Sequence, residues 1–114
     1  MPLFTIAIPT YNRASLLEQC LKSALSQTFP VLEILVSDNA STDATPLILA
    51  SITDHRLRVV RQSENLGAIP NWNECLRQAR GEYVVILSDD DLVSPTFLRR
   101  CAHLITPGLP SSSG

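Results

Sequence analysis

The chain has 114 residues, of which 45% are hydrophobic and 18% charged, and its formal net charge is −2. This length suffices for one globular domain with its own core. No apolar run approaches the roughly 20 residues of a membrane-spanning helix, the start "MPLFTIAIPTYNR" lacks the features of a signal peptide, and the near-neutral charge argues against a broad nucleic-acid surface.

The first half of the chain predicts strand, helix, strand and helix in turn. "LFTIAI" at 3–8 is short, apolar and partly β-branched, which is typical of a buried strand. Leucine, cysteine and alanine recur at helical spacing over 14–27, and Pro30 prevents the helix from continuing. "EILVS" at 33–37 predicts a second strand, and 42–52 predicts a helix with Asp and Thr at its front and a proline in its first turn.

The second half repeats the alternation. "LRVVR" at 57–61 predicts a third strand, and the helix predicted over 70–80 starts with a proline and stops at Gly81. "EYVVIL" at 82–87 predicts a fourth strand. The last helix is expected over 94–105, with its serine as the cap and its proline at the first helical position.

This alternation predicts an α/β fold, with a parallel sheet of about four strands and helices on both faces. The ligand crevice of such a sheet lies beyond the carboxyl ends of the strands, near the point where the strand order reverses. The loops that follow the four predicted strands are "PTYNRAS", "DNASTDAT", "QSENLGAIPN" and "SDDDLVSP". All four are polar and must gather at one edge, so the sequence predicts a ligand site there.

Asp89, Asp90 and Asp91 stand in a row with no Lys or Arg within seven residues on either side. Such carboxylates raise one another's pKa unless a positive charge arrives, and Mg²⁺ or Mn²⁺ suits their oxygens. Alternate side chains at a strand end point to opposite faces, so not all three are expected to bind one ion. The alternative is a solvated acidic turn that caps the next helix.

Other polar residues after the first two strands suit a nucleotide. Asp38 can accept hydrogen bonds from a base or a ribose; the alternative is an Asx turn, with Asp43 as a helix cap. Tyr11 can stack on a base and Arg13 can meet a phosphate, unless Arg13 is only a surface side chain at a helix start, where the helix dipole disfavours a cation. Trp72 is expected in the core.

Cys20, Cys75 and Cys101 are an odd number without close spacing, and each falls in a predicted helix. Buried reduced thiols are therefore expected rather than a disulfide or a zinc site, which favours a cytoplasmic location. Association with the inner face of a membrane stays open as a peripheral alternative. The end "PGLPSSSG" predicts that a domain over 1–105 is followed by a disordered tail, or a scar left by cloning, at 106–114.

Four motifs in this order resemble the nucleotide-binding half of family 2 inverting glycosyltransferases, which have the GT-A fold. They are "IAIPTYNR", "VSDNASTDAT", "NLG" with Asn73 downstream, and "ARGEYVVILSDDD" with Pro95 following. The resemblance covers residues 3 to about 105. Each motif is modest, but four in the right order and spacing are specific.

The resemblance implies a nucleotide-sugar donor, often a UDP-sugar, and a bound Mg²⁺ or Mn²⁺. It implies that Pro9, Thr10 and Tyr11 line the base pocket, that Asp38 contacts the base, and that Asp89 contacts the ribose. Arg13, Asn65 and Gly67 complete the expected donor-binding set. Asp90 is the expected metal ligand with Asp91 beside it, because the first position of the family's Asp-x-Asp motif falls on Ser88; a register with Asp89 and Asp91 as the pair stays open.

Members of the family also carry a second half, which binds the acceptor and supplies an Asp or Glu as general base. No residue of this chain is expected to fill that role, so the expectation is donor binding without efficient transfer. The acceptor, saccharide or lipid, is undetermined, and an exposed sheet edge would favour a homo-oligomer. The alternative function is a non-catalytic sugar-nucleotide binding or regulatory module. A phospho-receiver domain is disfavoured because the only lysine, Lys22, lies in the first predicted helix.

Overall fold

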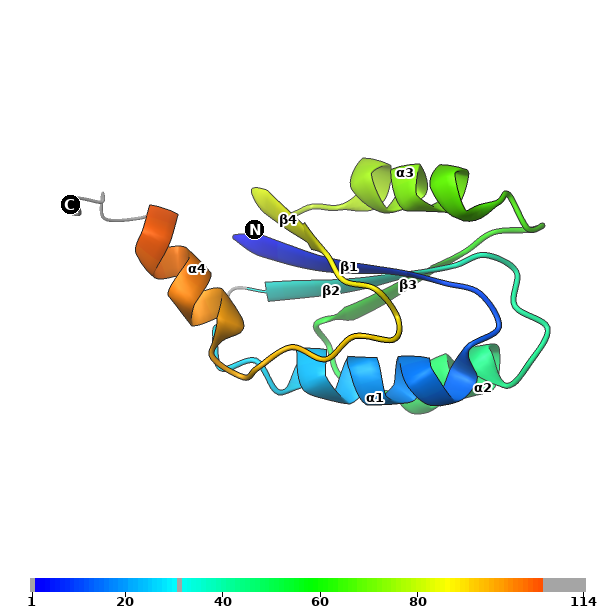
Figure 1. The fold of residues 1–114 in the computed structure, drawn as a ribbon, viewed down its shortest axis with the longest axis horizontal. Helices are drawn as coiled ribbons and strands as arrows, with labels where there is room; N and C mark the ends of the chain where they lie inside the picture. The colour runs from blue at the N-terminus through cyan, green and yellow to red at the C-terminus, as the bar shows by residue number, and fades with distance from the viewer. Residues whose placement is uncertain (1, 31, 106–114) are drawn as a thin grey trace.

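Strands and helices alternate through residues 2–30 and 32–105, the part of the chain that the computed structural model describes (Figure 1). The strands are β1 (Phe4–Thr10), β2 (Leu32–Asp38), β3 (Leu57–Arg61) and β4 (Tyr83–Ile86). The helices are α1 (Ala14–Leu25), α2 (Thr45–Ser51), α3 (Ala68–Gln78) and α4 (Phe97–Ile105). The predicted α/β class and the type and order of all eight elements are confirmed. The tail predicted at 106–114 lies outside the described residues.

The start of the last helix was predicted wrongly. α4 begins at Phe97 rather than at Pro95, and the two preceding residues form a turn. The Pro95 carbonyl accepts a hydrogen bond from the Thr28 N–H at 3.0 Å, and the Ser94 carbonyl accepts one from the Gln27 side chain. Contacts with the residues that follow α1 therefore hold this segment in place before the helix begins.

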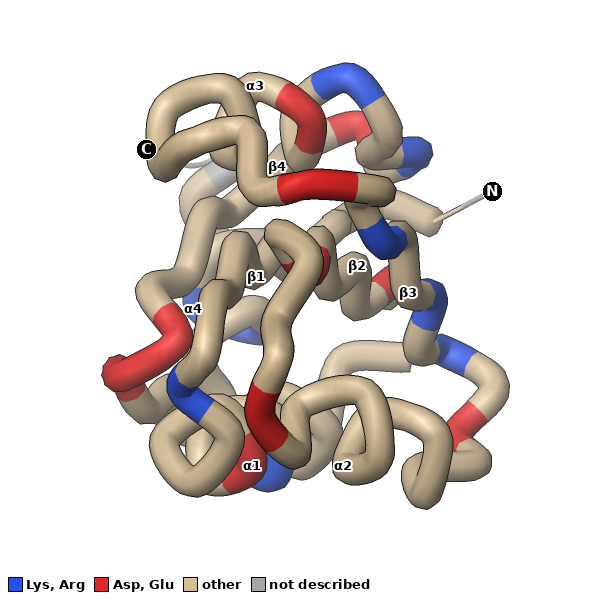
Figure 2. The backbone as a smooth tube through the Cα atoms, turned by 90° about the vertical axis from the view of Figure 1, so that its right-hand side faces the viewer, with Lys and Arg blue, Asp and Glu red and all other residues tan. Residues whose placement is uncertain are grey.

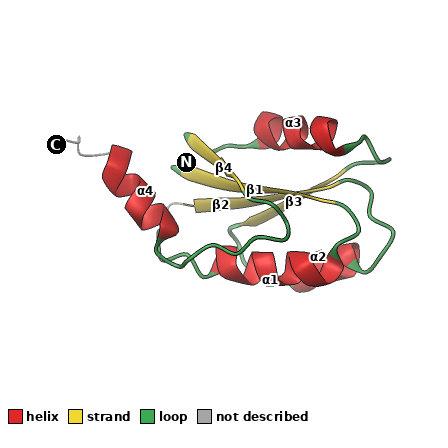
Figure 3. Ribbon diagram, viewed as in Figure 1, coloured by secondary structure: helices red, strands yellow, loops and turns green. Residues whose placement is uncertain are grey.

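The four strands are parallel and lie in the order β3-β2-β1-β4. The connections through α1 and α2 step in one direction along the sheet, so right-handed crossovers place both helices on one face. The connection through α3 steps back across β2 and β1, which places α3 on the other face (Figures 1 and 3). The strand order reverses between β1 and β4, and this is where a ligand crevice is expected.

The two faces of the sheet have different chemistry. The face toward α1 and α2 is an apolar core to which alternate residues of β1 and β2 contribute, among them Ile6, Ile8, Ile34 and Val36. The face toward α3 includes the buried polar side chains of Thr5, Glu33 and Ser37. α3 therefore packs on a partly polar surface, where hydrogen bonds as well as apolar contacts fix its position.

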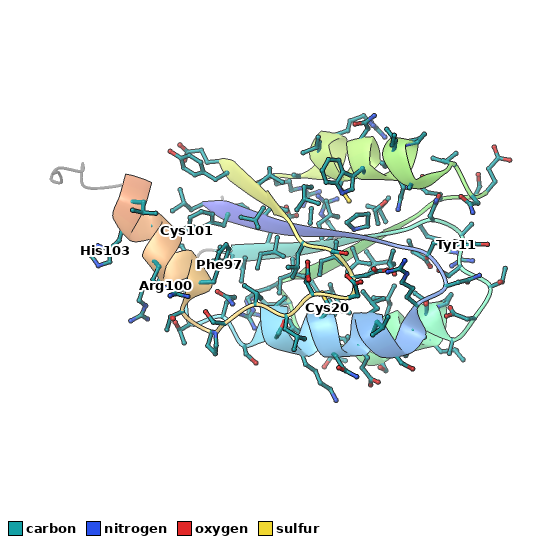
Figure 4. All side chains as sticks on the ribbon, in the orientation of Figure 1. Tyr11, Cys20, Phe97, Arg100, Cys101 and His103 are labelled. Atoms are coloured by element: carbon teal, nitrogen blue, oxygen red, sulfur yellow. The ribbon has the colours of Figure 1, made fainter. Side chains whose placement is uncertain are left out.

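α4 lies beside the amino ends of the strands, away from the edge where the strands end (Figure 1). Leu98 is fully buried in the core, with Phe97 and Cys101 packed against it, and His103 points away from the sheet (Figure 4). Cys20 and Cys75 are buried, Cys101 is only partly buried, and all three are free. In the described ranges, every helix is too short or too polar to cross a membrane.

The chain returns from β4 along α1, and this path anchors the acidic loop. The Val93 N–H donates to Ser23 Oγ at 3.2 Å, and the Leu98 N–H donates to Gln27 Oε1 at 3.1 Å. The Cys20 thiol donates to the Ser88 carbonyl at 3.5 Å. The segment after β4 is thus fixed at several points to one rigid helix.

Gly81 lies where the chain enters β4 and passes directly over β1. Its N–H donates to Thr5 Oγ1 at 2.8 Å, and a Cβ at this position would lie 2.5 Å from the Thr5 nitrogen. Backbone atoms cannot move aside as a flexible side chain can. Gly81 is therefore required by this close approach, and α3 has already ended at Gln78.

We expect Gly81→Ala to lower the free energy of unfolding by about 1–3 kcal/mol, because the added methyl group forces β4 away from β1. Urea denaturation monitored by circular dichroism measures this change. Glu82→Ala, at the exposed next position, is the control and should stay within about 0.5 kcal/mol of the wild type. Equal stability of the glycine variant and the wild type would contradict the close approach.

Glu33 is the buried charged group of the α3-facing side. Thr5 Oγ1 and the Arg80 N–H donate to its Oε1 at 2.8 and 3.0 Å, and Arg58 Nε donates to its Oε2 at 2.8 Å. Burial raises the pKa of Glu33, but hydrogen bonds from Arg58, Arg80 and Thr5 outweigh burial and hold it below its usual value. The ionised form is thus favoured by folding.

A carboxyl group with a lowered pKa stabilises the fold above its unfolded pKa and loses this contribution as the pH falls through the folded value. Between about pH 5 and about pH 3, the wild type should therefore lose more stability than Glu33→Gln. Urea denaturation across this range tests the difference. Glu64→Gln removes one exposed negative charge as the control, and parallel curves for the wild type and Glu33→Gln would contradict the prediction.

Candidate functional site

The loops that follow the four strands enclose one hollow at the carboxyl edge of the sheet. Its volume is about 450 Å³, within the range of small-molecule sites. Figure 2 views this edge along the strands, and Figure 4 shows Tyr11 at the same end of the molecule. Seven of the eight predicted donor-binding residues line the hollow, all except Asp38. It is also lined by five residues outside that predicted set: Asn39, Ala68, Asn71, Trp72 and Ser88.

Thr10, the last residue of β1, joins the two acidic loops. It pairs with Asp38 in the β1–β2 register, and its carbonyl accepts a hydrogen bond from the Asn39 N–H at 3.0 Å. On the other side, Thr10 Oγ1 donates to Asp89 Oδ2 at 2.8 Å. Asp38 and Asp89 therefore flank the end of the same strand, as the predicted gathering of the loops requires.

Arg13 supplies the positive charge that the acidic cluster lacks in the sequence. Its Nη1 lies 3.3 Å from Asp89 Oδ1 and 3.6 Å from Asp90 Oδ2. The Ser88 hydroxyl donates to Asp90 Oδ1 at 2.7 Å and lowers the pKa of Asp90, and the charge of Arg13 lowers it further. The expectation that these carboxylates raise one another's pKa is therefore wrong for Asp90, because the hydrogen bond from Ser88 and, to a smaller extent, the charge of Arg13 favour its ionised form.

The position of Arg13 at the start of α1 is supported by Asp43. Asp43 Oδ2 accepts a hydrogen bond from the Ala14 N–H at 3.1 Å and so places a negative charge at the α1 terminus. Its Oδ1 accepts from the Thr45 N–H at 2.9 Å at the start of α2. The structural role predicted for Asp43 is confirmed, and one carboxylate fixes the starts of two helices beside the hollow.

Asp38 lies behind the hollow rather than in its wall. It is only 1% exposed, its Oδ1 accepts from the Ser41 N–H at 3.0 Å, and its Oδ2 accepts from Arg61 Nη1 at 2.6 Å. The Asp38 side chain therefore bonds to the backbone three residues on, whereas an Asx turn would bond two residues on. A base contact by Asp38 stays a prediction, and a ligand that makes it has to compete with Arg61.

Asn39 is one of the site residues that the sequence analysis did not single out. Its Nδ2 donates to Asn65 Oδ1 at 2.8 Å and to the Gly67 carbonyl at 3.2 Å, and its Oδ1 accepts from the Leu66 N–H at 2.8 Å. Gly67 has φ +92°, which a residue with a side chain adopts only under strain. Asn39 thereby holds the "NLG" turn that begins α3. The signal in the sequence was an amide directly after the strand-end aspartate.

The prediction that Trp72 belongs to the core is wrong. The residue is 49% exposed and lines the hollow. Asn71 and Cys75 are the buried residues of α3, and Asn71 exchanges two hydrogen bonds with Ser37 on β2. One position further along the helix is about 100° around its axis, so Trp72 is turned away from the sheet.

The acidic loop fits a divalent cation in its chemistry. Carboxylate oxygens are the ligands that Mg²⁺ and Mn²⁺ prefer, and Mg²⁺ commonly takes only one or two of them from the protein. Asp89 and Asp90 already converge on one positive charge, and Asp90 is half exposed. Within residues 2–30 and 32–105, no group of three or more His, Cys, Asp and Glu side chains has metal-binding geometry. These residues fit an ion that takes most of its ligands from a substrate and from water.

A second hollow of about 470 Å³ lies at the opposite, amino edge of the sheet. Three of its charged side chains take part in ion pairs: Arg56 pairs with Asp54 at 2.9 Å, and Arg58 pairs with Glu33 at 2.8 Å. These pairs stabilise the fold, whereas the smaller hollow at the carboxyl edge holds the predicted site residues. We therefore assign the candidate site to the carboxyl edge.

Comparisons with known proteins point to one family. Residues 5–108 match the family described as "Glycosyl transferase family 2". The succinoglycan biosynthesis protein ExoO of Rhizobium meliloti is 36% identical over 100 residues, which are 88% of this chain and 29% of ExoO. The GalNAc(5)-diNAcBac-PP-undecaprenol beta-1,3-glucosyltransferase of Campylobacter jejuni is 40% identical over 94 residues, which are 80% of this chain and 30% of that protein.

Solved structures agree. TarS 1–349 of S. aureus in complex with UDP-GlcNAc has a TM-score of 0.83 and 33% identity, over 92% of this chain and 31% of that one. The mannosyltransferase PcManGT of Pyrobaculum calidifontis in complex with GDP-Man and Mn²⁺ has a TM-score of 0.81 and 35% identity, over 92% and 32%. This chain thus spans about a third of the proteins it matches. Because the family match covers nearly all of its residues, the chain belongs to glycosyl transferase family 2.

Proposed function

We propose that this chain is the donor-binding part of a glycosyltransferase, which binds a UDP-sugar together with Mg²⁺ or Mn²⁺ and takes part in inverting transfer to an acceptor hydroxyl. One observation carries the proposal: the carboxylates of Asp89 and Asp90 both face the guanidinium of Arg13. This cluster lies beside a hollow at the point where the strand order of the parallel sheet reverses. The bound UDP-GlcNAc and GDP-Man of two similar structures support a nucleotide-sugar ligand.

The nucleoside would bind at the end of β1. Tyr11 lines the hollow and exposes 41% of its surface, so its ring is free to stack on a base. Asp89 is held against β1 by Thr10, and its carboxylate can accept hydrogen bonds from ribose hydroxyls at little further cost in ordering. Pro9 and Thr10 provide the wall between these two groups.

The diphosphate would bind near Asp90 and Arg13. Asp90 is exposed, and its pKa is lowered by Ser88 and Arg13, so it is ionised and ready to hold a cation. A metal at Asp90 would neutralise charge on the diphosphate leaving group. Arg13 would then exchange its carboxylate partners for phosphate oxygens, to which a guanidinium binds well.

The shared contact favours Asp89 and Asp90 as the functional pair over Asp89 and Asp91. Arg13 Nη1 approaches both of the first two carboxylates, so their oxygens face the same point. No side-chain hydrogen bond or ion pair of Asp91 is found in the described part of the chain; its backbone N–H closes a turn on the Ser88 carbonyl at 3.0 Å. We propose that Asp91 shapes the loop and lies beside the ion as a secondary ligand.

The acceptor and the general base lie outside what this chain supplies under the proposal. In an inverting transfer a carboxylate base deprotonates the acceptor hydroxyl, which then attacks the anomeric carbon in line with the departing diphosphate. We place the protein in the cytoplasm, as its unpaired cysteines favour, and leave peripheral membrane association as an alternative. The outer edge of β4 carries exposed Tyr83 and Val84, which supports pairing with another copy.

Calorimetric titration of UDP, GDP and CDP, each with and without Mn²⁺, tests the donor site. We expect UDP to bind most tightly and only with the metal, because Asp90 and the diphosphate share it. Asp90→Asn should weaken metal-dependent UDP binding by about tenfold or more, a loss of at least about 1.4 kcal/mol.

Glu82→Gln is the matched control, since it removes an exposed carboxylate at the other end of β4, and it should bind UDP as the wild type does. If none of the three nucleotides binds to the folded chain at millimolar concentration, the proposed donor site is wrong. Metal-independent binding that Asp90→Asn leaves unchanged would instead favour the non-catalytic nucleotide-binding module.

We expect Asn39→Ala to release the "NLG" turn, because it removes three hydrogen bonds at once. The Leu66 amide should exchange its hydrogen faster, and UDP affinity should fall as the start of α3 becomes mobile; the stability cost is about 1–3 kcal/mol. Hydrogen exchange and calorimetry measure the two effects. Glu64→Ala in the same loop is the control. Unchanged protection of Leu66 would show that Asn39 does not hold the turn.

A further inference from the structure

Trp72 is the only tryptophan of the chain, and its large apolar ring is half exposed. It lines the hollow at the carboxyl edge together with Tyr11, the other aromatic residue of that wall. Trp and Tyr rings that remain exposed in a concave site are common contact residues for ligands. Packing of α3 against the sheet therefore does not explain why a tryptophan stands at this position.

The direction of Trp72 is fixed by its neighbours. Asn71 Oδ1 accepts from Ser37 Oγ at 2.7 Å and its Nδ2 donates to the Ser37 carbonyl at 3.0 Å, so the rotation of α3 about its axis is set. The start of the helix is held through Gly67, whose carbonyl accepts from Asn39. Ala68, one turn before Trp72, lines the same hollow with only a methyl group. Trp72 and the small Ala68 thus border the hollow from the same helix, and the Trp72 side chain stays half exposed there.

The exposure of Trp72 could instead be explained by an apolar stripe on α3 that binds another protein. Ile69, Trp72 and Leu76 are spaced by three and four residues, and all three are exposed, so another protein surface could cover them. Of these three, only Trp72 lines the hollow. This difference favours a ligand contact for Trp72 over a role shared with the stripe.

We propose that the indole of Trp72 stacks on the planar base of the donor nucleotide and forms, with Tyr11, the aromatic part of the base pocket. This inference rests on the proposed donor-binding function. Every base has a π face, so stacking adds affinity with little preference among bases. Trp72 therefore contributes to binding of UDP, GDP and CDP alike, while hydrogen-bonding groups elsewhere in the pocket choose between them.

The fluorescence of the single tryptophan reports on this contact directly. Titration of the chain with UDP in the presence of Mg²⁺ should quench or shift the Trp72 emission with the midpoint that calorimetry gives. Inorganic pyrophosphate, which has no base, should leave the emission unchanged under the same conditions. An equal response to pyrophosphate and UDP would overturn the stacking contact.

Substitutions supply the second test. Trp72→Ala should weaken binding of UDP, GDP and CDP by about tenfold each, and Trp72→Phe, which keeps an aromatic ring, should recover most of the affinity. Leu76→Ala, one turn further along the same exposed face, is the matched control and should bind as the wild type. Thermal unfolding of each variant shows that the fold is kept.

The outcomes separate this inference from the proposed function. If the wild type binds UDP and Trp72→Ala binds it within about twofold of the wild type, the donor site stands and the stacking is wrong. If Trp72→Ala and Leu76→Ala weaken binding equally, the α3 stripe acts as a whole and the specific contact is again wrong. If no nucleotide binds to the folded wild type, the proposed function fails and this inference fails with it.

Discussion

The hydrogen bond from Thr10 Oγ1 to Asp89 Oδ2 joins two loops whose residues lie 79 positions apart in the chain. The rest of the site depends on it, because Thr10 also pairs with Asp38 across the β1–β2 ladder and so sets the distance between the two acidic loops. The constraint behind it is the order of the parallel strands. β2 and β3 lie on one side of β1, and the return through α3 places β4 on the other, so the acidic loop after β4 begins beside the end of β1.

The charge balance of the site follows from the same arrangement. The acidic triplet has no basic residue near it in the sequence, yet Arg13 contacts two of its members because β1 and β4 are neighbours. The start of α1 in turn tolerates the cation, since Asp43 from the loop after β2 caps that helix. Three loops thus balance one another's charge. The proposed diphosphate and metal would enter a site where the pKa of Asp90 is already lowered and the guanidinium of Arg13 is already positioned.

The chemical difference between the two faces of the sheet explains why an apolar side chain of α3 lines the hollow. Helices α1 and α2 cover an apolar face, where burial of Ile6 and Ile34 supplies much of the stability. On the other face, α3 is positioned by hydrogen bonds such as those between Ser37 and Asn71. Because a polar helix face is directed at the sheet, the largest apolar side chain of α3 is left exposed at the site. The same asymmetry explains the proposed role of Trp72.

The sequence by itself determined the α/β class, the order and type of all eight elements and the gathering of four polar loops, because these depend on local periodicity, on Pro and Gly positions and on the geometry of parallel sheets. Seven of the eight residues that it predicted for donor binding line one hollow in the structure. Only the tertiary structure decided that Arg13 neutralises Asp89 and Asp90, that Asp38 is buried behind Arg61, that Asn39 holds the turn before α3 and that Trp72 lies in the wall. These features are contacts between residues far apart in the chain. They depend on which strands become neighbours and on the rotation of a helix about its axis, and neither is contained in the pattern of any single segment.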